Sequence, residues 1–146
     1  MRKHTLIANE HDETRHSYRV ILGTDIGTFV GEVECRPEDQ EYESRYFGWE
    51  LAELKALIKH AKAKARHYEA LWSELVNFWG EMSKTRTYDE DAFWVKKIAQ
   101  RIDEYEEKAR EWKHLANDMK KAYHVKIQSF DMLNKKRNKC EEYHHD

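Results

Sequence analysis

The sequence has little of what interrupts helices or cross-links small domains. Of its 146 residues, one is proline, five are glycine and two are cysteine. No apolar run approaches the ~18 residues of a membrane-spanning helix. The cysteines lie far apart and no signal-peptide pattern is seen at the start, so reduced thiols are expected rather than a disulfide framework. We therefore expect a cytoplasmic protein that does not associate with membranes.

Motifs for catalysis or cofactor binding are also lacking. The sequence has no glycine-rich phosphate loop, no nucleophile elbow and no separated pairs of cysteines. His60 and His67 are seven residues apart rather than the three or four (about one helical turn) that would place two imidazoles over one metal ion, and their heptad positions point outward. The terminal EEYHHD predicts at most adventitious metal binding. We expect no enzyme, no cofactor and no metal.

The helix-breaking residues that do occur are concentrated in the first third of the chain. HSYRVIL alternates Tyr18, Val20 and Leu22 with other residues, GTDIG offers a turn, and TFVGEVEC alternates again. This period of two predicts a β-hairpin over residues ~16–35. Leu6 and Ile7 are expected to add a third strand, since an isolated hairpin is marginal in water.

Beyond Leu51 the apolar residues recur every three or four positions, which is the seam of a coiled coil. One series runs from Leu51 to Met82 and a second from Val95 to Tyr123. Thr87 and Glu90 fit a capping box at the start of the second helix. The predicted fold is α+β: a small β-module over 1–48, then a long antiparallel helical hairpin with a basic C-terminal helix over 49–146, together one cooperative domain.

A connection of about five residues favours antiparallel packing within one chain. Folding the chain near Thr85 places Tyr68 opposite Ile102 and Phe47 opposite Tyr123. An intermolecular coiled coil would use the same seams, so monomer and homodimer both remain open.

Basic residues flank the first seam. In the predicted register Lys62 faces Glu106, whereas two pairs oppose like charges, Lys64 with Lys108 and Lys55 with Lys113. One interpretation is a solvated flank whose aliphatic stems cover the seam. The other is a site for an anionic partner, because an external anion would relieve the repulsion. The candidate partner-binding residues here are Lys55, Lys59, Lys62, Lys64, Arg66, Lys108 and Lys113.

A denser basic run lies between Lys120 and Cys140 and carries a charge of about +6. It either docks on the acidic residues 1–48, with Ile127, Phe130, Met132 and Leu133 covering the sheet, or meets phosphate groups or an acidic protein surface. The partner-binding candidates here are Lys120, Lys121, Lys135, Lys136, Arg137 and Lys139.

Three aromatic residues fall off the seam: Trp49, Phe93 and Trp94. Trp49 is expected to meet the sheet and Trp94 to pack on Phe78. The alternative is that these residues anchor a protein partner.

The segment VGEVECRPEDQEYESRYFGWELAELKA resembles a pattern in small accessory proteins of Gram-positive bacteriophages. The resemblance rests on Gly31, Cys35, Pro37, Asp39, Tyr42, Gly48 and Ala52. It implies a location in the cytoplasm of a bacterial host cell, if the protein is phage-encoded. Some proteins of this kind are anti-CRISPRs, which bind a Cas effector and block it. Pro37 in a first helical turn and Gly48 at a close helix-to-sheet approach also explain the segment structurally.

Together these observations lead to the hypothesis of a non-enzymatic binding protein that occludes a larger partner. The resemblance implies that the partner is a host defence nuclease complex, such as the ribonucleoprotein of Cas9 with its guide RNA. Two alternatives stay open: a nucleic-acid-binding protein that uses the basic helical faces, and a structural or assembly protein that dimerises through its helices.

Overall fold

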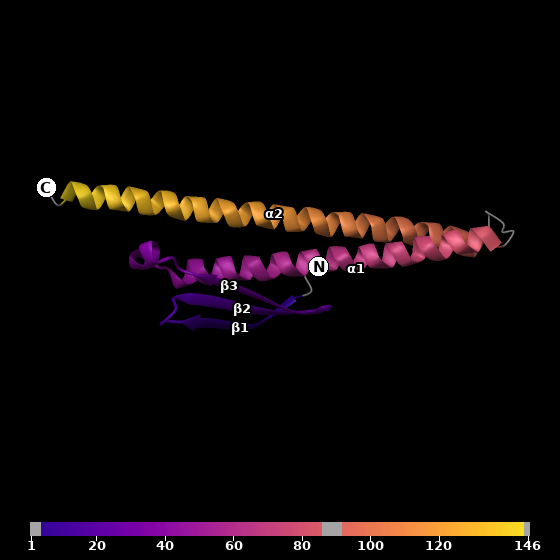
Figure 1. Ribbon diagram of the computed structural model, residues 1–146, viewed down its shortest axis with the longest axis horizontal. Coiled ribbons are helices and arrows are strands. Elements are labelled where there is room, and N and C mark those ends of the chain that lie inside the picture. Colours follow the sequence, from indigo (N-terminus) through magenta and orange to yellow (C-terminus); the bar gives the residue numbers. More distant parts are fainter. Residues whose placement is uncertain (1–3, 86–91, 145–146) are drawn as a thin grey trace. The chain divides into compact units, whose positions relative to one another are not determined.

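The computed structural model describes the backbone of residues 4–85 and 92–144, and the side chains of residues 4–84 and 92–133. The described chain contains strands β1 (His4–Asp12), β2 (Ser17–Thr24) and β3 (Gly27–Glu34), the 3-10 helix η1 (Pro37–Tyr42), and helices α1 (Arg45–Thr85) and α2 (Phe93–His144) (Figure 1). This confirms the predicted α+β fold, in which a three-stranded antiparallel sheet precedes two long helices.

The chain forms two compact units. The sheet unit contains residues 1–60 and 116–146, and the helical unit contains residues 61–115. Each helix contributes to both units, so the units divide within α1 and α2. Residues 1–48 all belong to the sheet unit.

The sheet has the order β1-β2-β3, with both neighbouring pairs antiparallel. Thr24 pairs with Gly27, so Asp25 and Ile26 form a two-residue turn between β2 and β3. Gly27 has φ +133°, a conformation that residues with a Cβ rarely adopt. The predicted hairpin and the third strand are therefore confirmed. The register of β1 against β2 shifts between Leu6 and Ala8, which indicates a β-bulge at Ile7.

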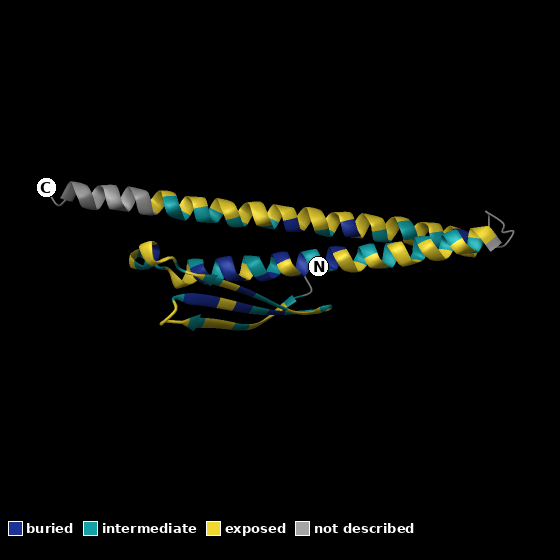
Figure 2. Ribbon diagram, viewed as in Figure 1, coloured by how far each residue is buried: buried dark blue, intermediate teal, exposed yellow. Residues whose placement is uncertain are grey.

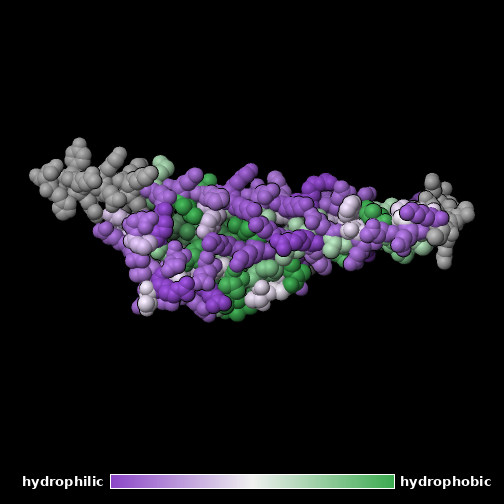
Figure 3. Space-filling model, in the orientation of Figure 1, coloured by the Kyte–Doolittle hydropathy of each residue, from purple (hydrophilic) through white to green (hydrophobic). Residues whose placement is uncertain are grey.

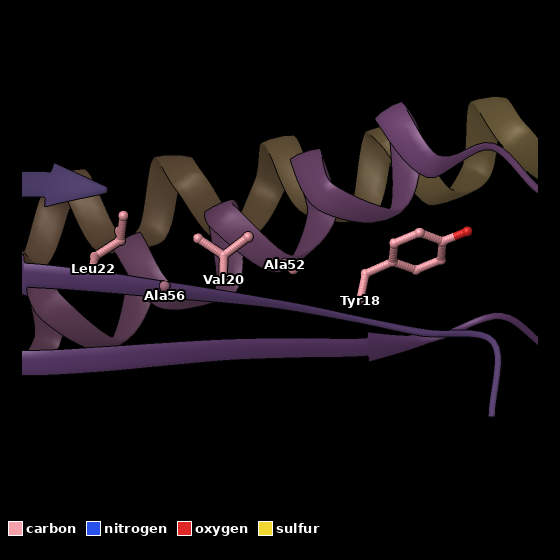
Figure 4. Close-up of a cluster of buried hydrophobic side chains, with 5 residues drawn as sticks. All are labelled: Tyr18, Val20, Leu22, Ala52 and Ala56. Atoms are coloured by element: carbon pink, nitrogen blue, oxygen red, sulfur yellow. The ribbon is translucent and has the colours of Figure 1, made fainter. Parts of the chain in front are cut away.

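The core of the sheet unit lies between β2 and the start of α1. Tyr18, Val20 and Leu22 are each 1% exposed and pack against Ala52 and Ala56 (Figure 4). The alternation along β2 points these three side chains to the same face, and Figure 2 shows the buried positions of β2 next to those of α1. The helix presents alanines here, so its backbone approaches the sheet closely.

Two glycines permit this close approach. A Cβ built on Gly31 of β3 would lie 1.8 Å from the carbonyl oxygen of Ala52, and one on Gly48 would lie 2.4 Å from a ring carbon of Tyr18. Both distances are shorter than atoms tolerate. The expected roles of Gly48 at the sheet and of Pro37 at the first position of a helical turn are confirmed.

In the helical unit the predicted seam residues Ala61, Ala65, Val95 and Ala109 are buried. The expected register, however, was wrong. Tyr68 lies near Tyr105, with ring centroids 6.2 Å apart, instead of opposite Ile102.

In the sheet unit, too, a residue of α1 contacts a residue later in α2 than the predicted register gives. Phe47 stacks on Phe130 at 4.7 Å rather than on Tyr123, seven residues earlier. The physical reason is the connection: α1 continues to Thr85 and α2 begins only at Phe93, so the chain reverses later than a five-residue loop after Met82 would require. The proposed capping residues Thr87 and Glu90 lie outside the described residues.

Candidate functional site

The two lysines at the start of the predicted basic flank are bonded to the sheet. The amino group of Lys55 donates to the carbonyl oxygen of Glu32 at 3.1 Å, and that of Lys59 donates to Val30 at 2.7 Å. Both acceptors belong to β3, an edge strand. Alternate carbonyls of an edge strand have no partner within the sheet, so these lysines satisfy groups that would otherwise attract another strand.

Lysines in the helical unit lie against aromatic rings. Lys64 is buried, with its nitrogen 5.7 Å from the ring centre of Tyr68 and 5.8 Å from that of Trp112. Lys108 lies 5.4 Å from the ring centre of the same Tyr68. Lys64 and Lys108 therefore share Tyr68 as a neighbour, and the π face of its ring attracts both ammonium groups.

The other expected like-charge pair is replaced by separate partners. Lys113 forms an ion pair with Glu69 in the helical unit. Lys55, besides its hydrogen bond to Glu32, lies 5.7 Å from the ring centre of Tyr123 in the sheet unit. Arg66 is exposed and Lys62 is half-buried. Most of the predicted anion site is thus occupied by internal interactions.

The C-terminal basic run is only partly within the described side chains. Lys120 and Lys121 are exposed, and Lys126 forms an ion pair with Glu50 of α1. The side chains of Lys135, Lys136, Arg137 and Lys139 lie outside the described residues, so their role as partner-binding residues stays a prediction.

The apolar residues of this run behave differently from expectation. Phe130 packs on Phe47 of α1, whereas Met132 and Leu133 are exposed, so they do not cover the sheet. On the same helix Asp131 pairs with Arg36. Asp131 is the acidic residue of the basic run, and Arg36 is a basic residue of the acidic segment 1–48. The docking is therefore local and is not a general attraction between opposite charges.

The three off-seam aromatic residues have different environments. Trp49 is half-buried, donates its indole N–H to the carbonyl oxygen of Glu10 at 3.3 Å, and lies edge-on to Tyr18, so it meets the sheet as expected. Trp94 is 42% exposed and lies near Trp79, at 6.2 Å between ring centroids. Its packing on Phe78 stays a prediction. Phe93 is 76% exposed.

Phe93 and Trp94 belong to a group that we call the aromatic end: Phe78 and Trp79 at the end of α1, and Phe93 and Trp94 at the start of α2. Phe78 is also 50% exposed. Figure 3 shows apolar surface near this end of the helices. Large aromatic side chains exposed together are unusual on a protein surface without a partner.

His60 was wrongly expected to point outward. It is 4% exposed, lies 5.4 Å between ring centroids from Phe29, and has Nε2 3.7 Å from the carboxylate of Asp25 in the β2–β3 turn. The heptad assignment considers only the helical partner, and the sheet covers a second face of α1 here.

A cavity of about 270 Å³ in the sheet unit was not foreseen from the sequence. β2, the segment after β3, the start of α1 and the second half of α2 contribute to its wall. Phe47 and Phe130 form part of the apolar side, and Arg36, Asp39 and Glu43 form part of the polar side. No sequence signal indicates this cavity, because it depends on the register that brings Phe130 to Phe47.

Charges around the cavity are linked to one another. The Nε of Arg36 donates to Asp39 at 2.8 Å, and the same guanidinium pairs with Asp131. These two carboxylates raise the pKa of Arg36 above its ordinary value. Glu43 has an oxygen 3.0 Å from Nδ1 of His16.

Two further groups on the cavity wall respond to its negative charge. Burial, and after it the charge of Glu43, raises the pKa of Tyr18 to about 12. Burial and the charges of Glu43 and Asp39 raise the pKa of the Cys35 thiol to about 11. The thiol therefore stays protonated at neutral pH and is a poor nucleophile.

Within the described residues, neither long helix has a stretch apolar enough to span a bilayer. No group of three or more His, Cys, Asp or Glu side chains suited to a metal ion occurs in the described part of the chain. Comparison of the chain with protein-family models, with curated proteins and with solved structures finds no match.

Proposed function

We propose that this protein is a non-enzymatic binding protein that inhibits a larger partner by covering part of its surface. The aromatic end carries this proposal. Phe93, Phe78 and Trp94 are all substantially exposed at the junction of the two helices. Aromatic side chains are enriched among the residues that contribute most to protein–protein affinity, because they bury large areas with few rotatable bonds.

The state of the lysines favours a protein partner over nucleic acid. Lys55 and Lys59 bind strand carbonyls, Lys64 is buried, and Lys113 is paired with a carboxylate. Phosphate binding would require these side chains to leave their present partners. Among the described side chains of the C-terminal basic run, Lys120 and Lys121 are exposed, and binding by two lysines is weak and strongly salt-dependent.

The resemblance of the segment around Pro37 and Gly48 to phage accessory proteins makes a host defence nuclease complex the partner that we propose. Cas9 bound to its guide RNA is the specific complex to test. In this proposal the aromatic end inserts into an apolar site on the complex and the protein acts by occlusion, so no covalent step is required.

The test measures binding of the protein to the Cas9–guide complex and the inhibition of target cleavage. Phe93→Ser is the test variant and Tyr46→Ser the matched control, because both residues are 76% exposed and lie in different units. We expect Phe93→Ser to lower affinity at least about tenfold, the usual cost at a hot-spot residue, and Tyr46→Ser to leave it nearly unchanged.

Three results would contradict the proposal. If the protein neither binds the complex nor inhibits cleavage, the proposed partner is wrong. If Phe93→Ser and Tyr46→Ser bind equally well, the aromatic end is not the binding surface. If the free protein binds duplex or single-stranded nucleic acid with an affinity that falls steeply with salt, direct phosphate binding explains the interaction better.

A further inference from the structure

The cavity of the sheet unit contains a buried hydroxyl without a protein partner. Tyr18 is 1% exposed, and its hydroxyl forms no hydrogen bond with any described residue. The Glu43 carboxylate lies close enough to raise the pKa of Tyr18 by its charge and as a hydrogen-bond acceptor, yet no hydrogen bond of ordinary length and angle joins the two groups. A buried hydroxyl that stays unbonded costs free energy, so this position calls for a partner.

The direction of Tyr18 leads to the cavity. Figure 4 shows the ring at one end of the buried cluster, with its hydroxyl pointing away from Val20 and Leu22. One face of the ring is closed by Gly48, and the residues that perturb the hydroxyl, Glu43 and Cys35, line the cavity together with Tyr18. The hydroxyl thus ends among cavity residues and not in the apolar core.

The polar side of the cavity has an excess of negative charge. One guanidinium, that of Arg36, pairs with the two cavity carboxylates of Asp39 and Asp131, and also with Glu38 at 3.7 Å. Glu43 adds a third carboxylate, whose partner His16 has its Nδ1 at 3.0 Å and is charged only when protonated. The group that best offsets this excess is a cation with N–H donors, which both a carboxylate and a tyrosine oxygen accept.

The opposite side of the cavity is aromatic and aliphatic. Phe47 and Phe130 are stacked within 12° of parallel, and Leu51 and Ile127 extend the same wall. At about 270 Å³ the cavity is smaller than the ~300–1,000 Å³ of sites for drug-sized ligands, so the occupant is a small one.

We propose that this cavity binds a small amphipathic cation, an ammonium or guanidinium group on a short apolar body, with Glu43 and the Tyr18 hydroxyl accepting its N–H bonds and Phe47 and Phe130 contacting the apolar part. A free amine and a basic side chain of a bound protein share this chemistry. The site is separate from the aromatic end, so the inference does not depend on the proposed function.

The test is titration of the full-length protein with three probes, followed by the amide signals of Cys35 and Gly48 in two-dimensional NMR spectra. Phenethylamine represents a free amine, Nα-acetyl-lysine amide represents a protein side chain, and phenethyl alcohol is the neutral match of the first probe. We expect at least one cationic probe to bind at least about tenfold more tightly than the alcohol, because hydrogen bonds to charged groups are the stronger ones. The cationic probe that binds more tightly shows whether the natural occupant is a free amine or a basic side chain of a bound protein.

Variants separate a built site from general attraction. Glu43→Gln should weaken binding of the cationic probe at least about tenfold, because it removes the negative charge, and Tyr18→Phe should weaken it several-fold, because it removes one acceptor. Glu53→Gln removes an exposed carboxylate of α1 outside the cavity wall and should change the affinity by less than about twofold. The Tyr18→Phe spectrum also serves as the folding check, because the ring against Gly48 is retained.

Three outcomes would overturn the inference. The first is that neither cation binds better than phenethyl alcohol, which would make the cavity a packing defect. The second is that Glu43→Gln and Glu53→Gln weaken binding equally, which would show attraction to the net charge of the surface. Retention of full affinity in Tyr18→Phe, with Glu43→Gln defective, would remove the hydroxyl from the site and with it the reason for placing the cation there.

Discussion

The sheet unit and the helical unit solve the packing of the same helices in different ways. In the sheet unit three large side chains of β2, each 1% exposed, pack on alanines of α1, and glycine at Gly31 lets the two backbones approach. In the helical unit the buried residues are mostly alanines, while Phe78 and Trp94 at its end stay 50% and 42% exposed. Close packing is thus concentrated on the sheet side.

Lysine side chains differ between the units for a related reason. Next to the sheet, Lys55 and Lys59 find strand carbonyls, which are strong acceptors fixed in position. In the helical unit the backbone acceptors are used within the helices, so Lys64 and Lys108 lie on the ring of Tyr68 instead. The neighbouring element therefore decides what a lysine binds: strand carbonyls in the sheet unit and an aromatic ring in the helical unit.

The largest expected effect tests the close approach in the sheet unit. Gly31→Ala would place a Cβ 1.8 Å from the Ala52 oxygen and 2.7 Å from the Ala56 nitrogen. Since both are backbone atoms of a helix, relief requires movement of α1, and we expect the free energy of unfolding to fall by at least about 3 kcal/mol. Denaturant unfolding followed by circular dichroism measures this.

The matched change in the helical unit should have the opposite sign. A Cβ added to Gly80 of α1 would meet nothing within 4 Å, so Gly80→Ala should raise the free energy of unfolding by about 0.5–1 kcal/mol through helix propensity. Equal effects of the two substitutions would mean that the difference in packing between the units is not real.

How much of this could be predicted depends on the range of the interactions. The strands and the seam follow from local periodicity: the alternation at Tyr18, Val20 and Leu22, and the heptads containing Ala61 and Ala65. Gly48 was identified because close approach to a sheet leaves few alternatives to glycine. These patterns involve residues only a few positions apart in the sequence, so they can be recognised without knowing the tertiary structure.

The register and the cavity could not be predicted, because they depend on where the chain reverses. A shift of one heptad preserves every seam position, so the sequence pattern is equally consistent with Phe47 opposite Tyr123 or Phe130. His60 was misplaced for a similar reason, since a heptad identifies one buried face and says nothing of a sheet on another. The partners of Lys55 and Lys59 could not be predicted either, because they are carbonyl oxygens of β3 and depend on how the sheet packs against α1.

An intermediate effect is expected at alkaline pH and should originate in the sheet unit. The folded pKa values of Tyr18 and Cys35, about 12 and about 11, lie above the values of 10.0 and 9.0 for the unfolded chain. The stabilisation from these groups is complete below pH 9 and is lost progressively as the pH rises from 9 to 12. For Tyr18 the loss is of the order of 2 kcal/mol.

Unfolding curves at pH 8.5 and pH 11.5 measure this loss. Tyr18→Phe should lose less stability than the natural protein between the two pH values, and at pH 8.5 it should be as stable or about 1 kcal/mol more stable, because an unbonded buried hydroxyl is removed. Tyr68→Phe is the control for loss of one phenol from the helical unit. A pH dependence that Tyr18→Phe leaves unchanged would contradict the assignment.

The smallest expected effect concerns the protected edge of the sheet. Lys59→Gln shortens the side chain so that it no longer reaches the carbonyl oxygen of Val30, and the loss of one exposed hydrogen bond should cost only about 0.5 kcal/mol of unfolding free energy.

Association is the more sensitive measurement, because a freed edge of β3 can pair with another strand. We expect the double variant Lys55→Gln, Lys59→Gln to self-associate at protein concentrations where Lys120→Gln, Lys121→Gln, with the same change of charge on exposed residues of α2, sediments like the natural protein. If both double variants associate equally, reduced charge is the cause, and the two lysines beside β3 have no protective role that lysines elsewhere lack.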